Sequence, residues 1–176
     1  MQTFRLNFVF FSLYLLSWVI EYFIIFKVQN YLLGTISLYF PMLIFIPHGI
    51  RVIGSMVYGP KIFLGLLTAH FVTGYFFLED LMMILILSTL SVVAAYIAIY
   101  LVFKKFNLNS DDIVVNKIIL IAIISSILNS MFNIVIKGNE HVNFYNFIGY
   151  GVGDLIGTLI VFYVLIQFFK TMQYKI

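Results

Sequence analysis

The sequence has no cysteine, only three prolines and few charged residues. Without cysteine the chain can form no disulfide, no thiolate nucleophile and no cysteine-based metal site, so cysteine usage does not indicate its compartment. Asp, Glu, Lys and Arg make up 10% of the 176 residues, whereas a soluble domain carries about 25%. This shortage excludes a water-facing surface over most of the molecule. The basic residues stand singly rather than in runs, which argues against a nucleic-acid partner.

What the sequence does contain is apolar: 63% of its residues are hydrophobic and 19% are aromatic. A helix that crosses the hydrocarbon core of a bilayer needs about 20 apolar residues. Segments of this kind lie at 5–26, 31–58, 61–78, 81–103, 113–136 and 144–169. Short polar breaks join them, so consecutive helices must be antiparallel neighbours. We therefore predict an all-α integral membrane protein, a compact bundle of six transmembrane helices that forms one domain over residues 1–176, with the lipid bilayer as its first partner.

Basic residues decide the orientation, because cytoplasmic loops are enriched in Lys and Arg. One side of the predicted bundle collects Arg5, Lys61, Lys104, Lys105, Lys117, Lys170 and Lys175. The other side receives only Lys27 and Lys137. The asymmetry predicts that both termini are cytoplasmic, in a multi-pass protein of the bacterial inner (plasma) membrane.

The stretch FIPHGIRVIG at 45–54 interrupts the second predicted helix, which is longer than an upright crossing requires. Pro47 and Gly49 both disfavour a continuous helix, so we predict a kink or an unwound turn at 47–49. The same stretch carries His48 and Arg51. A charge in the membrane interior is costly and normally faces the bundle, where it finds a partner.

Four ionisable residues fall in the middle to inner part of the predicted bilayer: His48, Arg51, His70 and Asp154. One interpretation is structural: Arg51 and Asp154 form an ion pair that sets helix register, and the two histidines make core hydrogen bonds. The other is a ligand-binding site, in which the N–H groups freed after Pro47 form an anion nest for a small anionic or zwitterionic ligand. We expect no metal site, since neither histidine has a partner at i+4.

Other polar residues of the predicted helices have simpler interpretations. Glu21 is expected to reach the membrane interface at the end of the first helix. Asn129 and Asn133 lie four residues apart on one helix face, which favours hydrogen bonds between helices.

IGYGVGDLIG at 148–157 is a second unusual stretch. Gly149, Gly153 and Gly157 recur every four residues and form a smooth stripe on a helix, which allows another backbone to approach closely. Asp154 follows the middle glycine, so a closely packed helix carries a charge beside its contact stripe. A dinucleotide site is excluded because no strand precedes the glycines.

The stretches FIPHGIRVIGSMVYGPKIFLGLLTAHFV and GYGVGDLIGTLIVFYVL resemble the membrane-associated sensor (MASE) domains of the first type. The motifs that carry this resemblance are Pro47, Gly49, Ile50, Gly59, Pro60 and Gly65, followed by Gly153, Asp154 and Gly157. The resemblance covers residues 31 to 170 and implies a sensory membrane domain of bacterial signalling proteins, which normally precedes a kinase, cyclase or phosphodiesterase. The chain departs from the pattern in having six predicted helices rather than eight, and His48 and Arg51 at positions that are usually small or apolar. Its end at KTMQYKI leads us to expect no attached output domain.

We therefore expect a sensory or ligand-binding membrane module that binds an unidentified small ligand, or responds to protons, and signals through a partner protein. The alternative is the substrate-binding subunit of an energy-coupling-factor transporter. Such subunits dock through small residues on the first helix, where this chain offers only Ser12 and Ser17. A purely structural role is a third possibility. We expect no enzyme activity and no cofactor, since no paired-carboxylate or HExxH-type motif is present.

Overall fold

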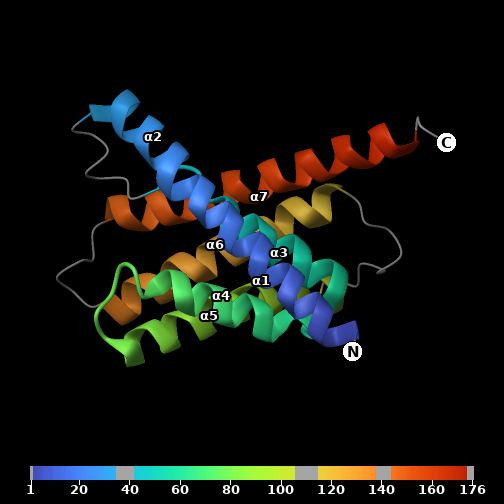
Figure 1. Cartoon of the computed structure of the whole chain (residues 1–176), viewed down its shortest axis with the longest axis horizontal. Coiled ribbons are helices and arrows are strands. Elements are labelled where there is room, and N and C mark those ends of the chain that lie inside the picture. The colour runs from blue at the N-terminus through green and yellow to red at the C-terminus, as the bar shows by residue number, and fades with distance from the viewer. Residues whose placement is uncertain (1, 35–41, 106–114, 138–143, 174–176) are drawn as a thin grey trace.

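A computed structural model describes residues 2–34, 42–105, 115–137 and 144–173. All the regular structure in these residues is helical: α1 Gln2–Ile20, a π turn Glu21–Ile25, α2 Phe26–Leu33, α3 Ile46–Tyr58, a 3-10 turn Gly59–Ile62, α4 Phe63–Gly74, α5 Leu81–Tyr100, a π turn Leu101–Lys105, α6 Val115–Lys137 and α7 Phe144–Gln173. Figure 1 shows them as one bundle beyond which α2 and the C-terminal part of α7 extend.

Five helical stretches of the described residues are long and apolar enough to cross a membrane: Gln2–Leu33, Ile46–Gly74, Leu81–Lys104, Val115–Ile136 and Tyr145–Phe168. Their outer faces carry large apolar side chains, including Phe4, Leu16 and Phe168, all more than half exposed. Lipid tails cover such a surface without cost. The chain is a multi-pass membrane protein.

The second predicted helix, 31–58, is wrong in its extent. Residues 31–33 complete α2, which ends at Gly34 with a φ of 53°. Residues 42–45 are not helical, and α3 begins only at Ile46. Pro47 therefore does not kink a helix but stands in the first turn of one, where its missing N–H and fixed φ suit the backbone.

The stretch Ile46–Gly74 divides at Gly59 into two short helices of 13 and 12 residues. Gly59 has a φ of 58°, a left-handed value that glycine adopts without steric cost. Figure 1 shows α3 and α4 diverging from this point. Asn7 holds the turn from α1, donating to Lys61 O at 2.7 Å and accepting from Gly65 N at 2.6 Å. On the other side, Tyr96 of α5 donates to Gly59 O at 2.9 Å.

The first helical stretch continues past its predicted end at 26 to Leu33, and α4 ends at Gly74 rather than at 78. The last three helices lie close to their predicted positions. Asp80 caps α5 by accepting from Met82 N and Met83 N. In the bundle, α3 occupies the centre: it packs chiefly against α7 and also against α1 and α5. Eight of its 13 residues are buried, including Arg51. The short central helix is thus the element around which the others assemble.

Candidate functional site

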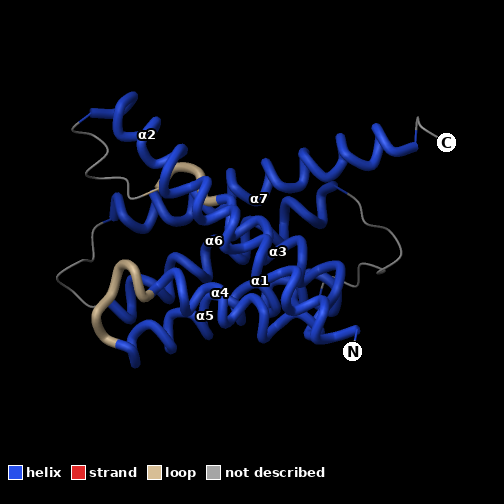
Figure 2. Tube along the Cα trace, viewed as in Figure 1, coloured by secondary structure: helices blue, strands red, loops and turns tan. Residues whose placement is uncertain are grey.

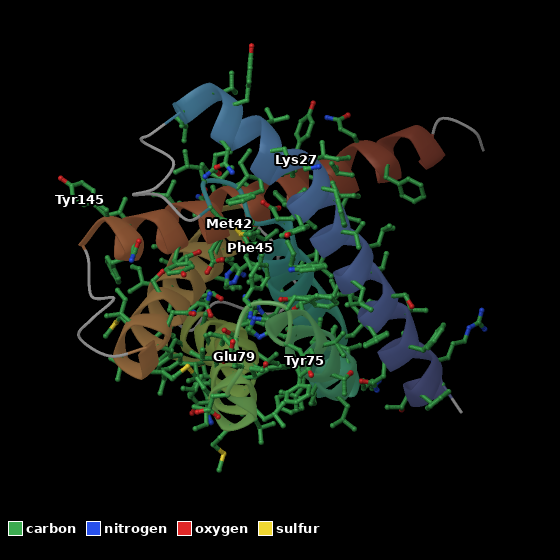
Figure 3. The ribbon with its side chains drawn as sticks, turned by 60° about the vertical axis from the view of Figure 1, so that its left-hand side comes forward. Lys27, Met42, Phe45, Tyr75, Glu79 and Tyr145 are labelled. Atoms are coloured by element: carbon green, nitrogen blue, oxygen red, sulfur yellow. The ribbon has the colours of Figure 1, made fainter. Side chains whose placement is uncertain are left out.

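The segment Met42–Phe45 enters the bundle as non-helical backbone and lies against the glycine stripe of α7. A Cβ atom placed on Gly153 would overlap the carbonyl of Met42, and one on Gly157 would overlap the carbonyl of Phe45. Figure 2 marks this segment as a loop within the helices, and Figure 3 shows Met42 and Phe45 between α7 and the α4–α5 pair. Gly153 and Gly157 of α7 therefore leave room for the non-helical segment Met42–Phe45. Helix α3 also approaches α7 closely here, because a Cβ on Gly49 would lie 2.6 Å from Gly157 O.

The N–H groups freed by this irregular segment are bound by the protein itself. Leu43 N donates to Gln29 Oε1 at 2.8 Å, and Phe45 N donates to Gly153 O at 2.9 Å. Ile46 N donates to Glu21 Oε2 at 3.2 Å. Non-helical backbone at membrane depth is tolerated only where its polar groups are satisfied in this way. These groups precede Pro47, whereas the anion nest was predicted after it, where His48 N donates to Phe45 O at 3.2 Å.

Glu21, expected at the membrane interface from its position near the end of the first predicted helix, is directed into the protein. Its side chain is fully buried, in the π turn between α1 and α2. It accepts from Ile46, the first residue of α3, where a negative charge complements the positive end of the helix dipole. A single π turn redirects side chains at functional positions, and here it turns a carboxylate toward the centre of the bundle.

His48 stands between Arg51 and Asp154. Its Nδ1 lies 2.6 Å from Arg51 Nη2 and 3.3 Å from Asp154 Oδ2, and its Nε2 lies 3.1 Å from Ser125 Oγ. All four side chains are buried. Among the described residues the two opposite charges do not meet directly, so the predicted Arg51–Asp154 pair takes the form of a chain with His48 in the middle.

The hydrogen bonds determine the tautomer of His48. A guanidinium is only a donor, so Nδ1 accepts from Arg51 and the proton of a neutral ring lies on Nε2, facing Ser125. Nδ1 is then an acceptor facing a carboxylate oxygen. Arg51 Nη2 and Asp154 Oδ2 thus both lie beside Nδ1 of His48, which accepts the hydrogen bond of the guanidinium.

Asp154 is held from the opposite side by α6. Asn129 Nδ2 donates to Asp154 Oδ2 at 2.6 Å, and Ser91 Oγ of α5 donates to Asn129 Oδ1 at 2.5 Å. The second asparagine, Asn133, donates to the backbone carbonyl of Asn129 at 2.9 Å. Asp154 is therefore the point where polar groups of α3, α5, α6 and α7 are joined.

A cavity of about 390 Å³ reaches Asp154 from the end of the bundle where α4 passes into α5. That volume is typical of sites for small molecules. Its polar lining includes Asp154, His70, Asn129, Asn133, Ser88 and Ser91. Its aromatic lining is Trp18, Tyr22, Phe26, Phe45, Phe77 and Tyr150. A mainly apolar wall with a few convergent polar groups is the usual form of a ligand site.

The four predicted site residues divide into two sets. Asp154 and His70 line the cavity, while His48 and Arg51 lie behind Asp154 and do not line it. His70 also packs edge-on against Tyr14, with ring centroids 5.9 Å apart. The described residues contain no group of three His, Asp or Glu side chains that could hold a metal ion.

The prediction missed the aromatic half of the cavity and the inward position of Glu21. Trp18 and Tyr22 were indistinguishable from the other aromatic residues in the chain, since most of these face lipid. Glu21 could have been noticed as a lone carboxylate in an otherwise apolar stretch.

Searches of protein-family models, of curated proteins and of solved structures find no match to this chain.

Proposed function

We propose that this protein is a membrane-embedded sensory module that binds a small ligand in the cavity above Asp154. The single observation that supports this function best is the coincidence of the cavity with a buried polar chain. Asp154 forms part of the cavity wall and contacts His48 at 3.3 Å, and His48 belongs to α3, the central helix of the bundle. A ligand at Asp154 therefore lies one residue contact away from α3, the helix that packs against α7, α1 and α5.

The signal would be a shift of α3 against α7. A ligand that forms a hydrogen bond with Asp154 shifts the carboxylate of Asp154. This shift changes the contact between Asp154 and His48. Such a change counts as signalling only if the ligand prefers one of two arrangements of the bundle. The closely packed seam between Gly49 and Gly157 supports discrete arrangements, because backbone contacts at that distance cannot deform gradually.

The resemblance to MASE-type sensor domains supports the same function. Pro47 begins α3, Gly49 and Gly157 lie in the α3–α7 seam, and Gly59 forms the turn after α3. These motif residues thus surround the polar chain. A bacterial inner-membrane location, six crossings with cytoplasmic termini, and a signalling partner in the membrane or cytoplasm belong to this proposal.

A transport subunit is the second candidate, because a cavity within a helical bundle also suits a substrate-binding protein. Such a subunit needs a small-residue docking face on its first helix. The outward face of α1 instead carries exposed Phe4, Phe8 and Leu16, which favours sensing. Ligand uptake into vesicles that contain the chain and a candidate energy-coupling module distinguishes the two functions.

The test is a screen of the full chain in lipid nanodiscs against amines, carboxylates, sugars and neutral metabolites, with thermal unfolding as the readout. A compound that binds in the cavity should raise the unfolding temperature of the native chain and not that of Ser88→Phe, in which a ring fills the cavity. The matched control is Thr89→Phe on the next residue, which does not line the cavity and should respond like the native chain. Equal responses of the two variants, or no response to any compound, would refute a ligand site here.

A further inference from the structure

The charge on the cavity wall identifies the kind of ligand. Asp154 is the one carboxylate among the described lining residues, and neither Lys nor Arg is among them. Arg51, the charged residue that favoured an anionic ligand in the sequence, does not line the cavity and contacts His48 Nδ1 instead. We propose that the cavity binds a small organic cation, an amine or quaternary ammonium group, whose charge lies against Asp154. This inference rests on the proposed ligand-binding function and specifies its ligand class.

The carboxylate of Asp154 has a second oxygen, Oδ1, that can accept a hydrogen bond from a ligand. Within the described residues, Asn129 donates its hydrogen bond to Oδ2, and His48 Nδ1 lies 3.3 Å from the same oxygen. Asp154 is only 2% exposed, yet it forms part of the cavity wall. Oδ1 is thus positioned to accept from an ammonium group, and a charge-assisted hydrogen bond is stronger than a neutral one.

The aromatic residues supply the remainder of a cation site. Trp18 stacks on Tyr22 with ring centroids 5.5 Å apart, and Phe77 meets Trp18 edge-on at 5.9 Å. Phe45 follows the segment that lies against Gly153, and Tyr150 lies one helical turn before Asp154 on the same face of α7. The faces of such rings attract cations within about 6 Å, tryptophan most strongly.

The buried charges are compatible with a positive ligand. The described buried acidic residues are Glu21 and Asp154, and the buried basic residues are Arg51 and Lys117. Lys117 stands in the first turn of α6, above the ring of Phe103, so it belongs to an end of the bundle. Apart from Lys117, the described interior holds two carboxyl groups and one guanidinium. Where both carboxyl groups are ionised, a bound monovalent cation lowers the cost of the excess negative charge.

The experiment uses two pairs of probes that differ in charge but little in shape: choline with 3,3-dimethyl-1-butanol, and 2-phenylethylamine with 2-phenylethanol. Each is titrated into the full chain in nanodiscs. Trp18 is the only tryptophan of the chain and lines the cavity, so its fluorescence reports occupancy. At least one cation should bind about tenfold more tightly than its neutral partner, since aromatic rings and a carboxylate in a desolvated site favour the charged probe.

Asp154→Asn keeps the size and an acceptor oxygen but removes the charge, so it should remove the preference for the cation over its neutral partner. Glu79→Gln removes an exposed carboxylate at the same end of the bundle and should keep the preference. Equal affinity within both pairs, or a preference that survives Asp154→Asn, would overturn the inference. If neutral or anionic compounds bind and Ser88→Phe abolishes their binding, the ligand site stands and only its cation specificity is wrong.

Discussion

The seam between α7 and the segment before α3 predicts a large effect of the smallest possible substitution, Gly157→Ala. The added methyl group would overlap the carbonyl carbon and oxygen of Phe45 and approach Ile46 N at 2.9 Å. All three are backbone atoms, so no side-chain rotation relieves the overlap. The backbone itself is fixed by two hydrogen bonds, from Phe45 N to Gly153 O and from Ile46 N to Glu21 Oε2.

The magnitude follows from these contacts. Forcing an extra methyl group into a well-packed interior costs about 1–3 kcal/mol. Moving the segment away would lengthen both backbone bonds, each with a net contribution of about 0.5–1.5 kcal/mol. Before helix propensity is counted, Gly157→Ala should therefore lower the free energy of unfolding by roughly 2–6 kcal/mol. Ordinary helix propensity would act in the opposite direction, since alanine is favoured over glycine by about 1 kcal/mol.

The assay is reversible unfolding in mixed detergent micelles, with Trp18 fluorescence and helical circular dichroism as readouts. The matched control is Gly151→Ala on the same helix, where the new Cβ would meet only Ser130 Oγ, at 3.3 Å. A hydroxyl can rotate away, so this variant should be as stable as the native chain or slightly more so. Equal stability of the two variants would refute the close approach of residues 42–45 to α7.

Three further predictions concern the polar contacts. His48→Leu leaves the guanidinium of Arg51 buried without its acceptor and should cost about 3–5 kcal/mol in the same unfolding assay; adding Arg51→Met should restore most of the loss, and no restoration would contradict the role of His48 as the acceptor. Asp80→Ala removes the cap of α5 and should cost about 1 kcal/mol, whereas Glu79→Ala beside it should cost little; similar losses would contradict the cap. Asn7→Ala removes the two side-chain bonds that Asn7 makes to the turn between α3 and α4 and should cost about 1–3 kcal/mol, with faster proteolysis at the turn as a second readout; a native rate of cleavage would contradict it.

Composition was sufficient to predict a helical membrane protein, because too few charges are present to cover a soluble surface. The helix bounds after residue 80 also followed from apolar length. The region between 31 and 78 did not, since a proline after an apolar run is compatible both with a kinked helix and with a helix start. The structure has a helix start here because distant parts of the chain bind the freed N–H groups: Glu21, Gln29 and Gly153 supply the acceptors. Length alone cannot reveal such partners.

The residues of the candidate site could also be predicted only in part from the sequence. His48, Arg51 and Asp154 could be selected because ionisable groups are rare within a membrane helix. Which of these residues contact one another could not be predicted. The sequence favoured a direct pair of Arg51 and Asp154, whereas in the structure both contact the imidazole of His48. The cavity depends on which aromatic residues face inward, and neither α1 nor α4 is amphipathic enough for its sequence to indicate this.

The most direct test of the ligand cavity uses the absence of cysteine from the chain, which allows labelling at one introduced thiol. Ser88→Cys lines the cavity, and Thr89→Cys on the next residue does not. The cavity at Asp154 predicts that Ser88→Cys reacts faster than Thr89→Cys with a trimethylammonium methanethiosulfonate, and faster than it reacts with the sulfonate analogue. Equal rates at the two positions, or equal rates with the two reagents, would contradict a negatively charged ligand cavity in the bundle.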